Sequence, residues 1–348
     1  MKRRDSNLEL LRIISMSGIV AMHYLGMGGA IQNQVFPGFS WVFSNIIYAL
    51  CVPLVNCFVL ITGYFMVRKT VFSLRKPVEL LVITAFYGGL SWVIAAVCGA
   101  ADLSAAGIAQ AVFPFIRGSR WFVETYIILI LFAPFLNLLL LRLKREHYRL
   151  LLAIQLGLFC VWYSVGLSAP VLDDGYGILN FITLYLLGGY IRLHGTDFCR
   201  ICGRFCAIVY ALCALATFAL SCFINPFGYS FVTNIVGSTA LFLCFLKWDL
   251  GVRPKVNRIS AAAFDVYFVH SDFNTSYLLF SGLLGARFVA DTPWVIVHLL
   301  LVIPVVWLLG YGTCMLRTRM FSRTVDRLLD RCALLNQKID IDVVTESR

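Results

Sequence analysis

Two ionisable side chains, Arg12 and His23, lie within the first apolar segment of the chain, in the stretch LRIISMSGIVAMHY. Ten residues separate them. On an α-helix, eleven steps complete about three turns, so both side chains leave the same face, about 16 Å apart along the axis. A cation near one surface can hold an anionic group, and an imidazole deeper inside can exchange a proton. The pair therefore indicates a site that is reached from one surface and works further in.

Each of these two residues also has an ordinary structural role. A histidine in a membrane helix can hold two helices together, and an arginine near a membrane surface can extend its charge to the headgroups. Two such groups on one stripe favour a site, because ionisable residues in spanning helices are costly and tend to face a pathway. We expect Arg4, Asp5 and Glu9 to pair with Arg12 or to frame the opening.

A second polar cluster, FDVYFVHSDFNTS, lies in the ninth apolar segment. His270 is its deepest ionisable residue, and we expect it to line the site with Tyr267. Asp265 and Asp272 are seven residues apart, which places them on one face of a continuous helix. Asp265 is also explained by a place near a helix N-terminus, and Asp272 by contact with water.

The fourth apolar segment begins with RWFVETY. Arg120 and Glu124 stand at positions i and i+4, a spacing that allows an ion pair near the outer surface. Trp121 and Tyr126 suit the aromatic belt of a membrane protein, which accounts for most of the motif. Glu124 lies one turn further into the membrane, so we also expect it among the site residues.

The composition indicates a polytopic integral membrane protein, an all-α helix bundle in the lipid bilayer. Of the 348 residues, 60% are hydrophobic and only 14% are charged, whereas about a quarter of a soluble domain is charged. The net charge of +11 does not indicate nucleic-acid binding, because the basic residues form short clusters between the apolar segments.

The chain contains about ten apolar segments, and we expect each to be a transmembrane helix. If the N-terminus lies inside the cell and successive spans alternate in direction, 26 of the 29 Lys and Arg residues fall on the inner side. This positive-inside pattern predicts that both termini are cytoplasmic. The segments are about 7–29, 41–67, 77–99, 121–141, 149–167, 177–192, 203–224, 230–247, 257–281 and 293–316.

We expect one membrane domain over residues 1–316 and a basic cytoplasmic tail over 317–348, whose pattern suits a surface-lying helix. The start MKRR and the apolar run after it are typical of an uncleaved first helix rather than a signal peptide. The longest outer connection, 100–120, contains a weakly amphipathic piece that is expected to lie in the interface or to dip back into the bundle.

No metal site is expected. The nearest pattern is Cys199, Cys202 and Cys206, for which His194 is the only nearby fourth ligand, and reduced thiols at a cytoplasmic helix start explain it better. The sequence contains no Walker A motif, no GxGxxG, no HExxH and no H-x4-D.

Four stretches together resemble the acyltransferase family 3 proteins, ten-helix membrane enzymes that move acyl groups onto surface sugars. The first is Leu11–Tyr24, with its R-x10-H motif. FVLITGYF at Phe58–Phe65 is similar to the family's F-x4-G-Y element, although Thr62 stands where Ser is usual. Arg120–Asn137 and DVYFVH at Asp265–His270 resemble two later elements. The resemblance covers most of the chain in the right order, and no extra extracytoplasmic domain follows.

The resemblance implies an acyl-CoA, commonly acetyl-CoA, as the donor on the cytoplasmic side of the cell membrane. Arg12 would bind its phosphates, helped by the loop residues Arg68 and Arg75. His23 would act as general base or carry the acyl group briefly, and His270 or Glu124 would orient it. The acceptor would be a hydroxyl of a surface glycan or of its lipid-linked precursor. The residues expected to bind substrate are Tyr64, Trp121 and Tyr267.

A different class of protein remains open from the sequence. A transporter or flippase of a glycan or glycan precursor also needs polar groups within a helix bundle. Such a protein does not need a cation and a histidine on one helical stripe. A structural or assembly protein is a third class, which the same R-x10-H stripe disfavours.

Overall fold

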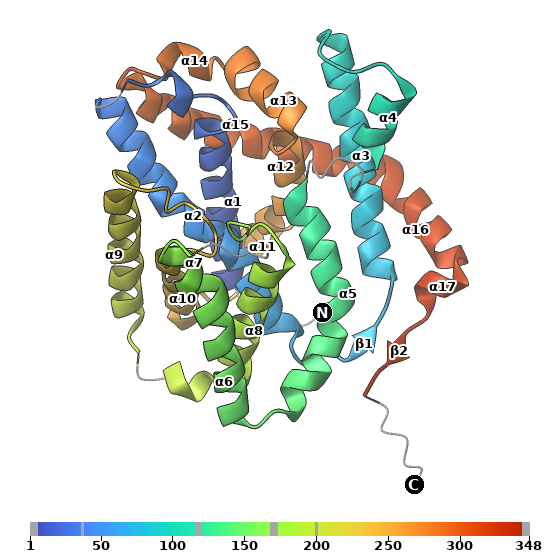
Figure 1. The fold of residues 1–348 in the computed structure, drawn as a ribbon. Coiled ribbons are helices and arrows are strands. Elements are labelled where there is room, and N and C mark those ends of the chain that lie inside the picture. Colours follow the sequence, from blue (N-terminus) through green and yellow to red (C-terminus); the bar gives the residue numbers. More distant parts are fainter. Residues whose placement is uncertain are drawn as a thin grey trace.

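The apolar segments fold into helices that pack side by side in one bundle (Figure 1). This computed structural model describes residues 6–35, 38–113, 115, 120–167, 173–198 and 201–342. In chain order the elements are α1 (Ser6–Leu25), η1 (Ile31–Asn33), α2 (Phe39–Met66), β1 (Val71–Phe72), α3 (Arg75–Val97), α4 (Ala105–Val112), α5 (Trp121–Arg142), α6 (Arg145–Leu156), η3 (Gly157–Val161), α7 (Trp162–Ser164), α8 (Ile178–Leu193), η4 (Gly195–Phe198), α9 (Gly203–Ser221), α10 (Val232–Lys247), α11 (Pro254–Ser260), α12 (Ala263–His270), α13 (Phe273–Tyr277), η5 (Leu278–Leu283), α14 (Ala286–Val289), α15 (Trp294–Arg317), η6 (Thr318–Ser322), α16 (Arg323–Arg331), α17 (Ala333–Asn336) and β2 (Ile339–Asp340).

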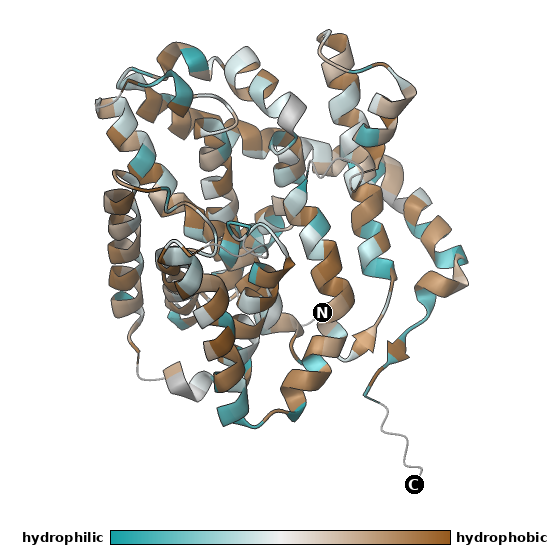
Figure 2. Ribbon diagram, in the orientation of Figure 1, coloured by the Kyte–Doolittle hydropathy of each residue, from teal (hydrophilic) through white to brown (hydrophobic). Residues whose placement is uncertain are grey.

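Within the described residues, six helices are long and apolar enough to cross a membrane: α1, α2, α3, α5, α9 and the stretch Trp294–Phe321. Helices α8 and α10 are apolar but shorter. Hydrophobic residues run along much of the bundle's long helices (Figure 2). The chain is therefore a helical, multi-pass membrane protein, as its composition predicted. The count of ten spans and the cytoplasmic position of both termini stay predictions.

The ninth apolar segment is not one continuous helix, because α12 ends at His270 and α13 begins at Phe273. The side chain of Ser276 bonds to the carbonyl oxygens of His270 and Asp272, both at 2.6 Å, and so satisfies the backbone where the helix breaks. The expectation that Asp265 and Asp272 share one helical face is therefore wrong. Asp265 instead accepts hydrogen bonds from Tyr87 and Arg317.

Helices α1 and α2 are the most buried of the six long helices and form the centre of the bundle. Two glycines allow α2 to pack closely against α8. A Cβ atom at Gly63 would lie 2.2 Å from the carbonyl oxygen of Tyr185, and one at Gly188 would lie 2.3 Å from that of Leu60. Small residues let membrane helices approach in this way. The FVLITGYF stretch therefore has a clear packing role.

Asn137 connects three helices near the end of α2. Its amide nitrogen donates to the carbonyl oxygens of Met66 and Lys69, each at 2.7 Å, and its amide oxygen accepts from Tyr185. The last carbonyls of a helix have no partner within that helix, so this side chain satisfies them. It also holds α5 and α8 against the end of α2.

The C-terminal segment folds back onto the start of α3. Strand β2 pairs antiparallel with β1, with Val71 opposite Asp340 and Phe72 opposite Ile339. The sequence did not predict this strand pair. Helix α16 is amphipathic, as expected for a tail that lies on a surface. At the other end of α3, helix α4 packs against the same helix, so part of the 100–120 connection returns to the bundle.

Candidate functional site

The centre of the site is a pair of histidines from two different helices. The imidazole rings of His23 on α1 and His270 on α12 have their centroids 5.0 Å apart. Nδ1 of His270 lies 2.6 Å from the carbonyl oxygen of Val266, which can only accept, so this nitrogen carries a proton. Nε2 of a neutral His270 therefore has its lone pair available. Nε2 of His270 and Nδ1 of His23 are buried and have no hydrogen-bond partner among the described residues.

Aromatic rings enclose this histidine pair. The ring of Tyr267 lies 6.4 Å from that of His23, and Phe122 lies 5.9 Å from Tyr267. Trp121 stacks on Tyr229 at 5.3 Å. These residues line a small cavity beside His23 of about 20 Å³, enough for one water molecule. We call it the histidine cavity; it is narrow and largely apolar.

A wider cavity adjoins the histidine cavity on the side of Arg12. It measures about 320 Å³ and shares Phe58, Phe122 and Phe264 with the histidine cavity. Arg12 and Glu9 lie on its wall. We call it the Arg12 cavity. Arg12 and His23 therefore line two adjacent cavities with three aromatic side chains in common, which the sequence spacing alone did not decide.

A third and larger space of about 630 Å³ adjoins the Arg12 cavity, between α3, α5, α12 and α15. The two share Lys76, Tyr126, Ala261 and Phe264. Lys69, Lys76 and Arg317 line this space, so it carries an excess of basic groups, although Arg317 is paired with Asp265. We call it the basic cavity, and the end of the bundle where it lies the basic end.

Arg12 is partly exposed and already has an acidic partner. Its guanidinium donates to Glu9 at 2.6 Å, and the second carboxylate oxygen of Glu9 accepts from Ser260. The guanidinium also lies 5.9 Å from the ring centre of Phe65. Pairing with Glu9 agrees with the expectation from the sequence, while Arg4 and Asp5 lie outside the described residues.

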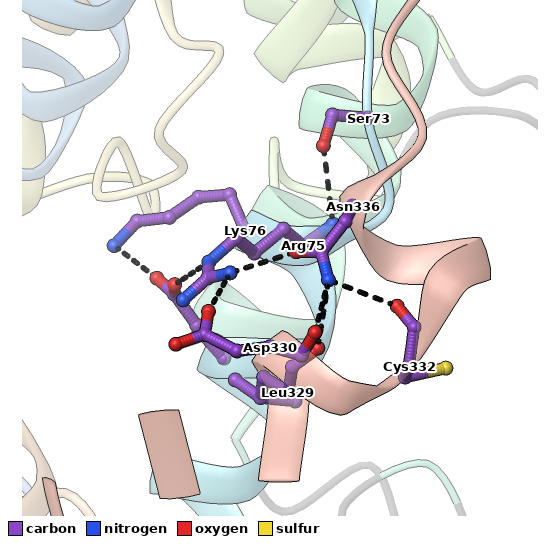
Figure 3. Close-up of polar contacts among 8 residues, drawn as sticks. Ser73, Arg75, Lys76, Leu329, Asp330, Cys332 and Asn336 are labelled. Atoms are coloured by element: carbon purple, nitrogen blue, oxygen red, sulfur yellow. Dashed lines mark hydrogen bonds and ion pairs between the residues drawn. The ribbon is translucent and has the colours of Figure 1, made fainter. Parts of the chain in front are cut away.

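Arg68 and Arg75, expected near the donor, are not among the residues that line these cavities. The side chain of Arg68 is exposed. Arg75 is bound by the C-terminal segment, donating to Asp330 at 2.6 Å and to Asn336 at 2.9 Å (Figure 3). Lys69 and Lys76, one residue further along in each case, line the basic cavity instead.

The structure brings Trp121 and Tyr267 to the histidine cavity but places Tyr64 elsewhere. The hydroxyl of Tyr64 accepts a hydrogen bond from Arg192 at 3.0 Å. Glu124 does not line the cavity either: its carboxylate accepts from the backbone N–H of Arg120 at the start of α5. Its carboxylate is still close enough to Tyr267 for an electrostatic interaction with the phenol group.

The ion pair expected between Arg120 and Glu124 is wrong at the level of the side chains. The guanidinium of Arg120 is 2% exposed and donates to Asp272 and to the carbonyl oxygen of Thr84, each at 3.0 Å. It also lies 5.6 Å from the ring centre of Phe268. Nothing in the sequence indicated this long-range pair, because Asp272 follows the break after α12.

No metal centre is evident in the part of the chain that the structure describes, which leaves out Cys199: no group of three or more His, Cys, Asp or Glu residues converges there. Cys202 lies just before α9, and the backbone N–H groups of Arg204 and Phe205 lower the pKa of its thiol below the ordinary value.

The fold and the site define a helical membrane protein with a pair of histidines beside a small aromatic cavity, next to the Arg12 cavity and the basic cavity. Residues 5–311 match the sequence model of the acyltransferase domain, Acyl_transf_3. The chain therefore belongs to this family of acyltransferases, as the resemblance predicted. The comparisons with curated proteins and with solved structures find no match.

Proposed function

We propose that this protein is a membrane-bound O-acyltransferase of the cell membrane. It moves an acyl group, most simply acetyl, from cytoplasmic acyl-CoA to a hydroxyl of a surface glycan or of its lipid-linked precursor. The observation that carries the proposal is the row of adjacent cavities, from the basic cavity through the Arg12 cavity to the histidine cavity, where His23 lies 5.0 Å from His270.

The basic cavity suits the phosphorylated part of the donor. Phosphate oxygens prefer charge-assisted contacts with Arg and Lys. Lys69 and Lys76 line the cavity, and Arg12 lines the adjoining Arg12 cavity. In this proposal they take the role that the sequence suggested for Arg68 and Arg75. The volume lies within the usual range of small-molecule sites, about 300–1,000 Å³.

The acyl end of the donor then points toward the histidine cavity. One imidazole nitrogen of His23 removes the proton of the acceptor hydroxyl as its oxygen attacks the thioester carbonyl. The carbon–sulfur bond breaks, and the departing CoA thiolate takes up the proton, which yields an ester and free CoA thiol. His270 is placed to share the proton through Nε2, because its Nδ1 is committed to Val266.

The surroundings of the histidines favour this reaction over competing hydrolysis. Aromatic rings of Trp121, Phe122 and Tyr267 leave room for about one water molecule beside His23. A site that excludes bulk water strengthens the electrostatic contacts made in the transition state. The histidine cavity must widen to admit the acyl group. In this proposal the ring of Phe122 moves, because it lines both the histidine cavity and the Arg12 cavity.

The proposal is tested with purified protein, radiolabelled acetyl-CoA and acceptor membranes. The membranes come from cells that lack this protein. We expect label in the membrane glycans with the natural protein and none with His23→Ala. His147→Ala, an exposed histidine on α6, is the matched control and should transfer normally. Mass spectrometry of surface glycans from cells with and without the protein identifies the acceptor. A glycan flippase would transfer no label, and full biological activity of His23→Ala would favour it.

A further inference from the structure

A separate cavity lies at the end of α3 that is farthest from the basic end. It measures about 550 Å³ and is enclosed by α3, the 100–111 segment with α4, and Asp272. Lys76 and Trp92 line the basic cavity and this outer cavity, respectively. They are sixteen residues apart on α3, which is about 24 Å along the helix axis. The outer cavity is therefore distinct from the donor site proposed above.

The outer cavity is a built feature, because α4 is fixed against α3. A Cβ atom at Gly88 would lie 1.9 Å from the carbonyl oxygen of Ala111, so only glycine permits this close approach. The indole N–H of Trp92 donates to the carbonyl oxygen of Asp102 at 2.9 Å. These contacts hold open a space of a size typical of small-molecule sites.

The lining of the outer cavity is polar and acidic. It contains Ser91, Trp92, Asp102, Gln110 and Asp272, and no Lys or Arg lines it among the described residues. Hydrogen bonds from Ser104 hold the pKa of the exposed Asp102 carboxyl below its ordinary value, so it is charged at neutral pH. Asp272 is paired with Arg120, so Asp102 carries the negative charge of the lining, and among the described residues no lining cation is available to a polyphosphate such as CoA. Carboxylate, amide and hydroxyl groups beside an indole ring suit a neutral molecule with many hydroxyl groups.

Asp272 lies on the wall of the outer cavity and close in the chain to the histidine pair. Its carboxylate lines the cavity and pairs with buried Arg120, and it lies two residues after His270 at the helix break. Nε of Arg120 and Oγ1 of Thr275 are buried there without a hydrogen-bond partner among the described residues, as are nitrogens of the two histidines. Buried polar atoms normally have partners, so this run of unpartnered atoms marks a place for polar groups of a substrate or for water.

We propose that the outer cavity binds the acceptor as an uncharged polyhydroxylated molecule, a saccharide, and presents one hydroxyl to His23 past the Arg120–Asp272 pair. This site rests on the acyltransferase function proposed above and gives it a second, opposite entrance. Donor and acceptor then meet at the histidines from two cavities, of which only the donor's is lined by Lys and Arg among the described residues.

Two variants test the outer cavity in different ways. Ala101→Trp fills it, and Gln110→Ala removes one polar contact while leaving room. Ala106→Trp, at an exposed position on α4 that does not line the cavity, is the matched control. Each variant receives radiolabelled acetyl-CoA and increasing amounts of acceptor membranes. These membranes come from cells that lack the natural protein. Binding of acetyl-CoA is measured separately.

We expect Ala101→Trp to lower transfer roughly tenfold or more with acetyl-CoA binding unchanged. Gln110→Ala should raise the membrane concentration for half-maximal transfer roughly tenfold and leave the maximal rate intact, as expected for a lost ground-state contact. Normal transfer by both variants would overturn the outer cavity as the acceptor site while leaving the acyltransferase proposal standing. No transfer by the natural protein, under conditions where acetyl-CoA binds, would overturn both.

Discussion

The imidazole rings of His23 and His270 lie 5.0 Å apart, although the two residues come from opposite ends of the chain. Hydrogen bonding to Val266 occupies Nδ1 of His270, whereas Nδ1 of His23 and Nε2 of His270 have no partner among the described residues. Two imidazoles whose unused nitrogens are buried are costly for the fold, and such costs are concentrated at functional sites. The arrangement is better suited to moving a proton than to holding helices together.

Replacement of either histidine should separate catalysis from donor binding. We expect His23→Ala to lower the rate of acyl transfer about 10²–10⁴-fold, the usual contribution of a general base, with little change in acetyl-CoA affinity. His270→Ala should have a smaller effect, because it acts on the proton through His23. Single-turnover transfer and equilibrium binding of acetyl-CoA measure the two quantities. A loss of binding that matches the loss of rate would contradict the assigned role of His23.

Arg12 should act on donor binding instead. We expect Arg12→Ala to weaken acetyl-CoA binding roughly tenfold or more, since a charge-assisted hydrogen bond contributes about 1.5–3 kcal/mol. Arg12→Lys should recover part of the affinity. The exposed Arg204 at the start of α9 offers a matched control, and Arg204→Ala should bind normally. Equal affinity of Arg12→Ala and the natural protein would remove Arg12 from the donor site.

The sequence predicted the helical membrane class and the family, and it singled out Arg12 and His23. These predictions depend on composition and on the helical period, which are local properties. The motif deep in the ninth apolar segment also singled out His270, whose ring lies 5.0 Å from that of His23, while its role in the site stays a prediction. Long-range partners were not predictable: nothing in the sequence shows that Arg120 meets Asp272, or that Lys76 rather than Arg75 faces a cavity.

One missed feature did have a local signal. The stretch after His270 contains Ser, Asp, Asn and Thr in close succession, and these residues compete with helix hydrogen bonds. That composition indicates a break in the ninth segment, which the apolar average of the segment concealed. The break is what gives Asp272 its partner Arg120.

The packing of α2 on α8 should be sensitive to a single methyl group. At Gly63 an added Cβ would lie 2.2 Å from a backbone carbonyl oxygen of α8, so the two helices must separate. We expect Gly63→Ala to destabilise the protein by about 1–3 kcal/mol, as overpacking does. Gly89→Ala is the control, because nothing lies within 4 Å of a Cβ there, and it should be neutral or slightly stabilising. Thermal unfolding in detergent compares them, and equal melting temperatures would be inconsistent with the close packing.

The C-terminal segment should loosen when its contact with Arg75 is weakened. Asn336 accepts a hydrogen bond from Arg75 and donates to the backbone of Asp330 at 2.7 Å (Figure 3). We expect Asn336→Ala to speed trypsin cleavage within α16 about fivefold, because one lost hydrogen bond is worth about 1 kcal/mol. Gln337→Ala, its exposed neighbour, should cleave at the natural rate. Identical cleavage of both variants would show that the Arg75 contacts do not hold the segment.

The buried pair of Arg120 and Asp272 should show strong energetic coupling. Arg120→Met leaves the Asp272 carboxylate without its cation and the Thr84 carbonyl without a donor. We expect a loss of about 3–5 kcal/mol in the free energy of unfolding, because the remaining charge stays buried.

The double variant Arg120→Met/Asp272→Leu should lose less than the sum of the single changes, since it leaves neither charge behind. Arg142 and Asp342 form a comparison pair at the surface, with side chains 57% and 50% exposed. Breaking that pair should cost only about 0–1 kcal/mol. Unfolding of all variants in the same detergent yields the coupling energy. A coupling energy for Arg120 and Asp272 no larger than that of the surface pair would mean that water reaches the ion pair. The ion pair would then not separate the outer cavity from the histidines.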